Sequence, residues 1–217
     1  MNKRKIDISI PKDFVAKLPV VHYPGVIRLI DTMEDALAAV EDINSYGVIG
    51  FDTETKPNFR KGGSHGVALL QISTGEVCYL FRINKLGFFK ELRDLFSNPD
   101  ICKVGLSVHD DFKMLGRLHQ FDACELVDLQ QMVKDYGIRD NALQRIYAIL
   151  FNERISKGQR LSNWEAGSLS PAQMEYAAID AWATLRIFNH LISGGFDPDS
   201  CPYKIQNPEE NPTTASL

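Results

Sequence analysis

Five side chains in three separated segments have the types and spacing that metal-assisted chemistry requires. They are the acids Asp52 and Glu54, the acid Asp111, and a tyrosine and an acid near the end of the chain, Tyr176 and Asp180. Four carboxylates brought into one pocket repel one another and resist loss of water unless positive charge lies between them. Divalent cations, which prefer hard oxygen ligands, would supply that charge. Two cations held in this way favour in-line hydrolysis of a phosphodiester bond.

The first two acids follow an apolar run and lie two residues apart. Residues 47–51 read Gly-Val-Ile-Gly-Phe, which predicts a core strand that ends in Asp52 and Glu54. Side chains two apart on a strand point to the same face of the sheet, so both acids can act on one ligand. The alternative is a pair of solvated acids in a loop, and this segment alone leaves it open.

The middle segment offers two adjacent acids, and helical geometry favours the second. An apolar stripe in this segment is formed by Val108, Phe112, Leu115 and Leu118. Asp111 lies on that stripe, whereas Asp110 falls beside it. An acid on a buried helix face needs a partner, which a metal ion would provide. The alternative is that both acids lie in the first helical turn and stabilise the helix dipole.

The last pair occupies one face of a predicted long helix. Tyr176 and Asp180 are four residues apart, so their side chains can converge. Neighbouring alanines would let this helix approach a sheet closely. Taken singly, the tyrosine could be an ordinary half-buried residue and the aspartate a surface acid.

The segments that must position these side chains predict an α/β domain with a mixed central sheet. Apolar runs predict strands at residues 48–53, 67–73, 77–81, 101–106 and 123–128. Helical periodicity predicts helices at residues 33–46, 87–96, 109–118, 128–135, 140–150 and 171–192. The last helix should begin at Ser170 as N-cap, with Pro171 in the first turn and Gln173 three residues after the cap.

Length and composition are typical of one globular domain. The chain has 217 residues, of which 44% are hydrophobic and 24% charged. We expect the folded domain to span residues 22–196, between a loose polar arm at 1–21 and a polar, Pro-rich tail at 197–217. No apolar run approaches the roughly 20 residues that span a bilayer, so we expect no membrane partner. No apolar signal core follows the charged N-terminus, and we expect a cytoplasmic location.

Net charge and cysteine spacing limit the kinds of partner and metal site that the chain could have. The net charge of −4 argues against a protein that coats nucleic acid over a long surface, but not against an enzyme that grips a few nucleotides. The four cysteines show neither zinc-ligand nor CxxC spacing, so we expect reduced thiols.

Together, the three acidic segments resemble the DEDD superfamily of 3′–5′ exonucleases. A tyrosine four residues before the last aspartate places the resemblance in the DEDDy branch, with RNase D and Werner-syndrome-type exonuclease domains. Further segments resemble the Werner type: GVALLQIS at 66–73 with CYLF at 78–81, KVG at 103–105, and SNWE at 162–165 ahead of YAAIDA at 176–181. The likeness covers roughly residues 25–192.

The resemblance implies an RNase H-like fold with a mixed five-stranded sheet flanked by helices. It also implies two divalent cations, Mg²⁺ or Mn²⁺. By that likeness Asp52, Glu54 and Asp180 would hold the first cation, Asp52 would bridge to the second, and Asp111 would bind the second directly or through water. Tyr176 would orient the attacking water. Its ordinary pKa of about 10 favours a hydrogen-bonding role over a basic one.

A nucleic-acid 3′ end would also need a stacking surface and a few phosphate contacts. Near the first motif, the stacking candidates are Phe59 and Leu70, each of which could instead be a core residue. Ahead of the last helix, the phosphate-contact candidates are Lys157, Arg160 and Asn163, each of which could instead be a solvated surface residue.

These observations predict a 3′–5′ exonuclease that releases 5′-mononucleotides. The Werner-like segments favour DNA as the substrate, and RNase D-like trimming of RNA is the alternative. A third hypothesis is an inactive nucleic-acid-binding module. The presence of all four acids and the tyrosine argues against it. With no helicase segment in the sequence, we expect a stand-alone enzyme or a subunit recruited by a helicase or repair protein; the oligomeric state stays open.

Overall fold

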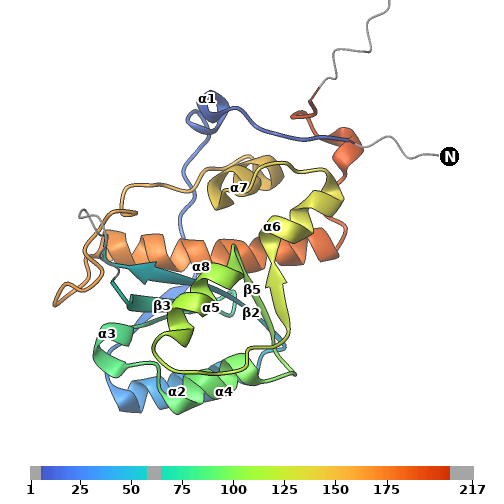
Figure 1. Cartoon of the computed structure of the whole chain (residues 1–217). Helices are drawn as coiled ribbons and strands as arrows, with labels where there is room; N and C mark the ends of the chain where they lie inside the picture. The colour runs from blue at the N-terminus through green and yellow to red at the C-terminus, as the bar shows by residue number, and fades with distance from the viewer. Residues whose placement is uncertain (1–5, 58–64, 206–217) are drawn as a thin grey trace, which may run out of the picture.

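The computed structural model describes residues 6–57 and 65–205. Its centre is a mixed sheet with strand order β1-β4-β3-β2-β5-β6 (Figure 1). In chain order the strands are β1 (Val26–Ile30), β2 (Val48–Thr55), β3 (Val67–Ser73), β4 (Val77–Phe81), β5 (Cys102–Gly105) and β6 (Leu126–Asp128). Strand β3 runs antiparallel to β2 and β4, and the other pairs are parallel. The α/β class and the mixed sheet are confirmed, but the sheet has six strands rather than five.

The additional strand is β1, at the edge of the sheet. It pairs in parallel with β4, with Val26 opposite Val77. Within this strand, Ile30 is the buried residue and the other four are exposed or half-buried. A short segment with neither a buried apolar run nor strict alternation gives little periodic signal, which is why the sequence did not reveal it.

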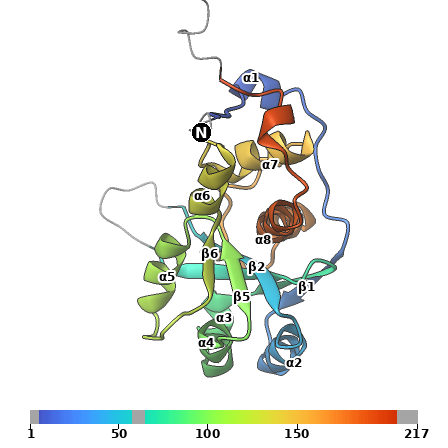
Figure 2. The ribbon, with the colours of Figure 1, turned by 90° about the vertical axis from the view of Figure 1, so that its right-hand side faces the viewer.

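Helices cover both faces of the sheet (Figure 2). On one face lie α2 (Met33–Ile43), α3 (Ile83–Leu86), α4 (Lys90–Ser97) and α5 (Val108–Gly116). The opposite face is crossed by α8 (Pro171–Ile192), and α7 (Leu143–Phe151) packs against α8. The remaining short helices are α1 (Lys12–Val15), α6 (Leu129–Met132), η1 (Val133–Tyr136) and η2 (Pro198–Ser200). In the described part of the chain, no helix combines the length and the apolar character needed to cross a membrane.

Helix α8 begins where the sequence predicts. The Ser170 side chain accepts a hydrogen bond from the Gln173 backbone N–H, and the Gln173 side chain accepts one from the Ser170 backbone N–H. The helix packs closely on β2 because position 50 is glycine. A Cβ atom at Gly50 would lie 2.2 Å from the carbonyl oxygen of Ala181. This close packing brings the functional side chains of α8 down to the end of β2.

The N-terminal segment, expected to be a loose arm, packs on the domain where the structure describes it. The side chains of Ile8 and Ile10 are fully buried beside α7 and α8. The Ile8 backbone N–H donates to the Gly137 carbonyl at 2.8 Å, and the Ile10 N–H donates to the buried Asp140 carboxylate at 3.0 Å. Cys201, in the expected tail, is buried in the same cluster. Ile6, Ile8 and Ile10 alternate with polar residues, but so short a pattern does not show which surface covers them, so the sequence did not predict this packing.

Replacing Ile8 with alanine should therefore lower the free energy of unfolding by about 2–5 kcal/mol, the usual cost of truncating a buried isoleucine. Urea denaturation of the variant and the wild type would measure this loss. Phe14→Ala is the matched control, because Phe14 lies in the same segment but is exposed. If Ile8→Ala were no more destabilising than the control, the segment would not be part of the folded domain.

Candidate active site

Three of the predicted acids meet between the sheet and α8. Ligand oxygens of Asp52, Glu54 and Asp180 all lie within 4.8 Å of one another. Asp52 and Glu54 are half-buried at the end of β2, and Asp180 is buried on α8. The alternation of side chains along β2 points both of its acids toward α8. The three carboxylates therefore share one small volume, as metal ligands must.

Asp111 approaches this group from α5. Its Oδ1 accepts a hydrogen bond from the hydroxyl of Thr53, the residue between the two acids of β2. Burial, and next the charge of Asp52, raise the pKa of the Asp111 carboxyl, so Asp111 and Asp52 interact electrostatically. The three-acid cluster itself does not include Asp111. Asp111 thus lies at the margin of the three-acid group.

The neighbouring acid has a different environment. Asp110 is exposed, and its carboxylate accepts a hydrogen bond from the Ser107 hydroxyl at 3.0 Å. This local contact is the helix-end role expected of a first-turn acid. As the helical-face argument predicted, Asp111 is the more buried of the two acids and Asp110 is exposed. A catalytic role for Asp111 stays a prediction.

Burial and mutual repulsion disfavour the charged carboxylates. Burial first, and then the charges of Asp52, Asp180 and Asp111, raise the pKa of Glu54 to about 9. Burial, followed by the charge of Asp180, raises the pKa of Asp52. Burial also raises the pKa of Asp180, although the neighbouring Tyr176 hydroxyl acts in the opposite direction. A bound cation would reverse these shifts because positive charge favours the carboxylate form.

Tyr176 places its phenol at the edge of the carboxylate group. The phenol and the Asp180 carboxylate interact, since each affects the pKa of the other. Burial, and next the charges of Asp180 and Glu54, raise the pKa of Tyr176 above its ordinary value. This raised pKa disfavours a role as a base at neutral pH. The orienting of a water molecule by Tyr176 stays a prediction.

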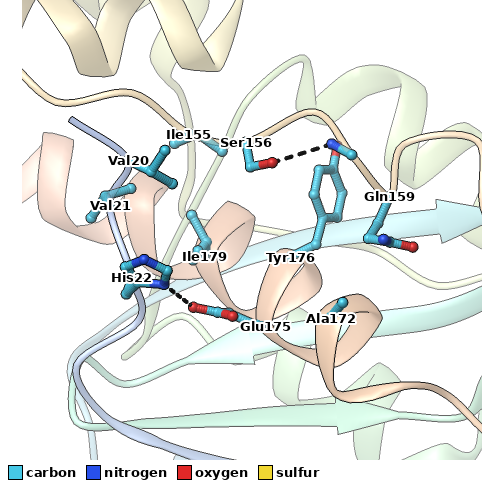
Figure 3. A pocket seen from close by; sticks show the side chains of 11 residues that line it. Val20, Val21, His22, Ile155, Ser156, Gln159, Ala172, Glu175, Tyr176 and Ile179 are labelled. Carbon is cyan, nitrogen blue, oxygen red and sulfur yellow. Dashed lines mark hydrogen bonds and ion pairs between the residues drawn. The ribbon is translucent and has the colours of Figure 1, made fainter. Parts of the chain in front are cut away.

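Figure 3 shows Tyr176 on one wall of a pocket of about 190 Å³. The pocket lies between the segment containing His22, the N-terminal turns of α8, and the loop that follows α7. Two residues of this loop, Ser156 and Gln159, flank the tyrosine ring in the view. The side chain of Tyr176 thus connects the carboxylate group to the loop that contains Lys157 and Arg160.

The donor set fits a divalent metal ion. Three carboxylates converge, and the buried Oδ1 of Asp180 has no hydrogen-bond partner within the described part of the chain. A buried carboxylate oxygen without a partner is costly unless a cation or an ordered water satisfies it. Hard oxygen ligands are those that magnesium and manganese prefer. The site therefore has the chemistry of a metal centre.

The five predicted substrate contacts differ in where the structure places them. Leu70 is fully buried on the sheet face that packs against α4 and α5, so it is a core residue and cannot stack on a nucleotide. Phe59 lies outside the described residues. Lys157, Arg160 and Asn163 are exposed on the loop between α7 and α8. The guanidinium of Arg160 also lowers the pKa of Glu54, against the larger effect of burial, which places Arg160 near the acids.

Two supporting residues escaped sequence analysis. Thr53 donates to Asp111, and Asp128 accepts a hydrogen bond from the Ser107 backbone N–H at 3.0 Å at the start of α5. The alternation of β2 shows that Thr53 faces away from its neighbours, but not that α5 covers that face. Ser107 has a positive φ of 61°, an unusual conformation for serine that the Asp128 contact helps to hold.

A protein-family model described as 3′–5′ exonuclease matches residues 27–193 of this chain. Among curated proteins, the bifunctional 3′–5′ exonuclease/ATP-dependent helicase WRN of Mus musculus is 30% identical over 210 residues. That match covers 89% of this chain but 14% of the mouse protein. The chain also spans about a quarter of a Drosophila melanogaster relative, exonuclease 3′–5′ domain-containing protein 2, to which it is 32% identical over 152 residues.

Solved structures show the same fold. Escherichia coli RNase D, described as an exoribonuclease involved in structured RNA processing, superposes with a TM-score of 0.70 at 21% identity, covering 77% of this chain and 44% of that one. The Nibbler EXO domain of Aedes aegypti gives a TM-score of 0.69 at 22% identity, covering 80% and 92%. These similarities confirm the RNase H-like fold expected from the sequence.

Proposed function

This chain belongs to the 3′–5′ exonuclease family, and on that premise we propose that it hydrolyses DNA from the 3′ end and releases 5′-mononucleotides. The observation that carries the proposal is the convergence of Asp52, Glu54 and Asp180, with Tyr176 one helical turn before the last of them on α8. The three acids come from the motifs that define the resemblance. Their meeting in one volume is what a phosphodiester-cleaving centre requires.

We propose that the site takes two divalent cations, Mg²⁺ or Mn²⁺. Asp52, Glu54 and Asp180 would hold the first, and Asp52 and Asp111 the second. When bound, such a pair lowers the pKa of the attacking water and stabilises the leaving oxygen. The protein's own part is to keep four carboxylates oriented, to exclude bulk water by burying them, and to direct the Tyr176 hydroxyl toward the reacting water.

Tyr176→Phe should slow turnover by roughly 10- to 100-fold, because it removes one charge-assisted hydrogen bond worth about 1.5–3 kcal/mol. The affinity for Mn²⁺ should change little, since the three carboxylates remain. Single-turnover rates and a Mn²⁺ titration would measure the two effects separately. A large loss of Mn²⁺ affinity in this variant would show that the phenol supports the ligand set and not the water.

The loop between α7 and α8 is the proposed contact surface for phosphates. Arg160 and Lys157 are exposed cations on this loop, and Arg160 lies near Glu54. Such contacts position a strand without reading its sequence. Neither residue need contact a base, which agrees with an enzyme that must accept every nucleotide.

The choice of DNA rests on the Werner-like sequence segments and on the mouse relative, which matches 89% of this chain at 30% identity. RNA is the second candidate. It is favoured by the structural similarity to RNase D, which is named as an exoribonuclease, although at 21% identity that similarity establishes the fold alone. Recruitment by a helicase or repair protein remains a proposal, as the chain spans 14% of a relative whose name includes a helicase.

Three 5′-labelled substrates would test the proposal: single-stranded DNA, 3′-recessed duplex DNA and RNA of matched sequence, each with Mn²⁺ or Mg²⁺. A ladder that shortens from the 3′ end on DNA alone is the expected result. The same ladder on RNA alone would replace DNA by RNA. Binding without a ladder on any substrate would indicate an inactive binding module and contradict the proposal.

A further inference from the structure

Gln71 is a buried amide beside the carboxylate group. It lies on β3 directly opposite Asp52 on β2, and its side chain is fully buried. Residues directly opposite in an antiparallel pair project to the same face, with Cβ atoms about 4.5–5.5 Å apart. That face is the one that α8 covers, because Asp52 meets Asp180 there. Gln71 therefore occupies the layer between the sheet and α8, next to the acids.

The amide of Gln71 has no hydrogen-bond partner at either end among residues 6–57 and 65–205. Its Nε2 and Oε1 are both buried without a hydrogen bond among the described residues. A buried polar group left unsatisfied costs roughly 1–3 kcal/mol, so such a residue usually has a reason to be there. On the side away from Asp52, its neighbour in register is Leu80, and nearby Leu69, Ala177 and Ala178 form an apolar cluster. Apolar side chains of that kind cannot form hydrogen bonds with the amide.

The carboxylate group contains a buried acceptor that a donor of the Gln71 amide could satisfy. The Oδ1 of Asp180 is a buried acceptor that has no partner in the described part of the chain, and Asp180 belongs to the group whose ligand oxygens lie within 4.8 Å of one another. Among the described residues, an unsatisfied donor and an unsatisfied acceptor thus lie in the layer between the sheet and α8. The amide is long enough that a small rotation of its side chain would move its N–H groups toward the acids.

We propose that Gln71 is a positioning residue whose amide N–H groups donate to the inner carboxylate oxygens of Asp52 and Asp180 when the site holds its cations. The inference rests on the proposed function, because it assigns Gln71 to that same metal site. Hydrogen bonds to ligating carboxylates fix their orientation, and their loss typically reduces metal affinity by roughly 10- to 100-fold. The unsatisfied amide of Gln71 would then gain its hydrogen bonds when the site binds its cations.

The test is Gln71→Met, which keeps the length of the side chain and removes both polar ends. Mn²⁺ affinity would be measured from free Mn²⁺ by electron paramagnetic resonance, and the melting temperature would be measured in EDTA. Ser73→Ala is the matched control, because Ser73 lies two residues along the same strand, is buried on the same face, and is opposite Gly50 rather than an acid. Its hydroxyl oxygen accepts from the Gly75 backbone N–H at 3.2 Å.

Gln71→Met should bind Mn²⁺ at least about tenfold more weakly, yet melt in EDTA at the wild-type temperature or higher. The control should show the reverse pattern, a lower melting temperature with unchanged Mn²⁺ affinity. Wild-type Mn²⁺ affinity in Gln71→Met, or a loss of stability in EDTA in both Gln71→Met and Gln71→Leu, would overturn the inference. If the wild type itself neither bound Mn²⁺ nor cleaved DNA, the proposed function would fail instead.

Discussion

Asp52→Asn is expected to reduce hydrolysis by at least roughly a thousandfold, because the cations it helps to hold supply several kcal/mol of transition-state stabilisation. The same change should stabilise the protein in the absence of metal. Burial and the charge of Asp180 raise the pKa of Asp52, which means that its charged form is unfavourable in the folded state. Asparagine has nearly the same shape and carries no charge, so it removes that penalty.

The pH dependence of stability should show the same effect. An acid with a raised pKa holds its proton in the folded protein after the unfolded chain has lost it, so the folded state binds more protons. The stability of the metal-free wild type should therefore fall as the pH rises from about 4, the ordinary value for an aspartate, through the raised pKa. The fall should be smaller in Asp52→Asn, and adding Mn²⁺ should reverse it in the wild type.

Turnover on labelled DNA and melting curves in EDTA between pH 4 and 9 would measure both effects. Asp122→Asn is the control, since Asp122 is an exposed acid outside the carboxylate group and should change neither quantity. Loss of activity accompanied by loss of stability in EDTA would show that Asp52 holds the fold together, and the assignment as a metal ligand would be wrong.

Asp111→Asn should lower the turnover rate by roughly 100-fold or more, whereas its neighbour's replacement, Asp110→Asn, should have less than about a threefold effect. The two changes are chemically identical and adjacent in sequence, but the side chains point to different surroundings. Asp111 interacts electrostatically with Asp52 and accepts a hydrogen bond from Thr53, while Asp110 is exposed and accepts one from Ser107. Single-turnover rates at saturating Mn²⁺ would compare the two variants.

Saturating metal also distinguishes binding from catalysis in these variants. If raising the Mn²⁺ concentration restored Asp111→Asn fully, the carboxylate would contribute affinity alone. An Asp110→Asn variant that lost as much activity as Asp111→Asn would mean that the helical-face argument had selected the wrong acid, or that the start of α5 is held in place by Asp110.

The parts of this structure that the sequence predicted have strong local signals. The hairpin of β3 and β4 and the full length of α8 were predicted to the residue, because one consists of two apolar runs around a tight turn and the other has a capping box. The first acidic motif was found because two acids end an apolar strand, the second because Asp111 lies on an apolar helix stripe, and the third because Tyr176 and Asp180 lie four residues apart on one helix.

The rest depends on contacts between distant segments. Strand β1 pairs with β4, and Ile8 packs beside α7 and α8; the local sequence of neither segment identifies these distant partners. Leu70 was a stacking candidate on proximity to the first motif, but strand alternation turns it to the opposite face. The unsatisfied amide of Gln71 could not be recognised at all, since satisfaction of a polar group is a property of the packed structure.

The most direct test of the metal-centred account is a release assay on DNA whose 3′-terminal nucleotide carries a labelled 5′ phosphate. With Mn²⁺, the wild type should release the label as a 5′-mononucleotide in the first turnover, EDTA should stop the release, and Asp52→Asn should not show it. Release of the label as inorganic phosphate, release in EDTA, or undiminished release by Asp52→Asn would contradict the assignment of these carboxylates as the centre of a 3′–5′ exonuclease.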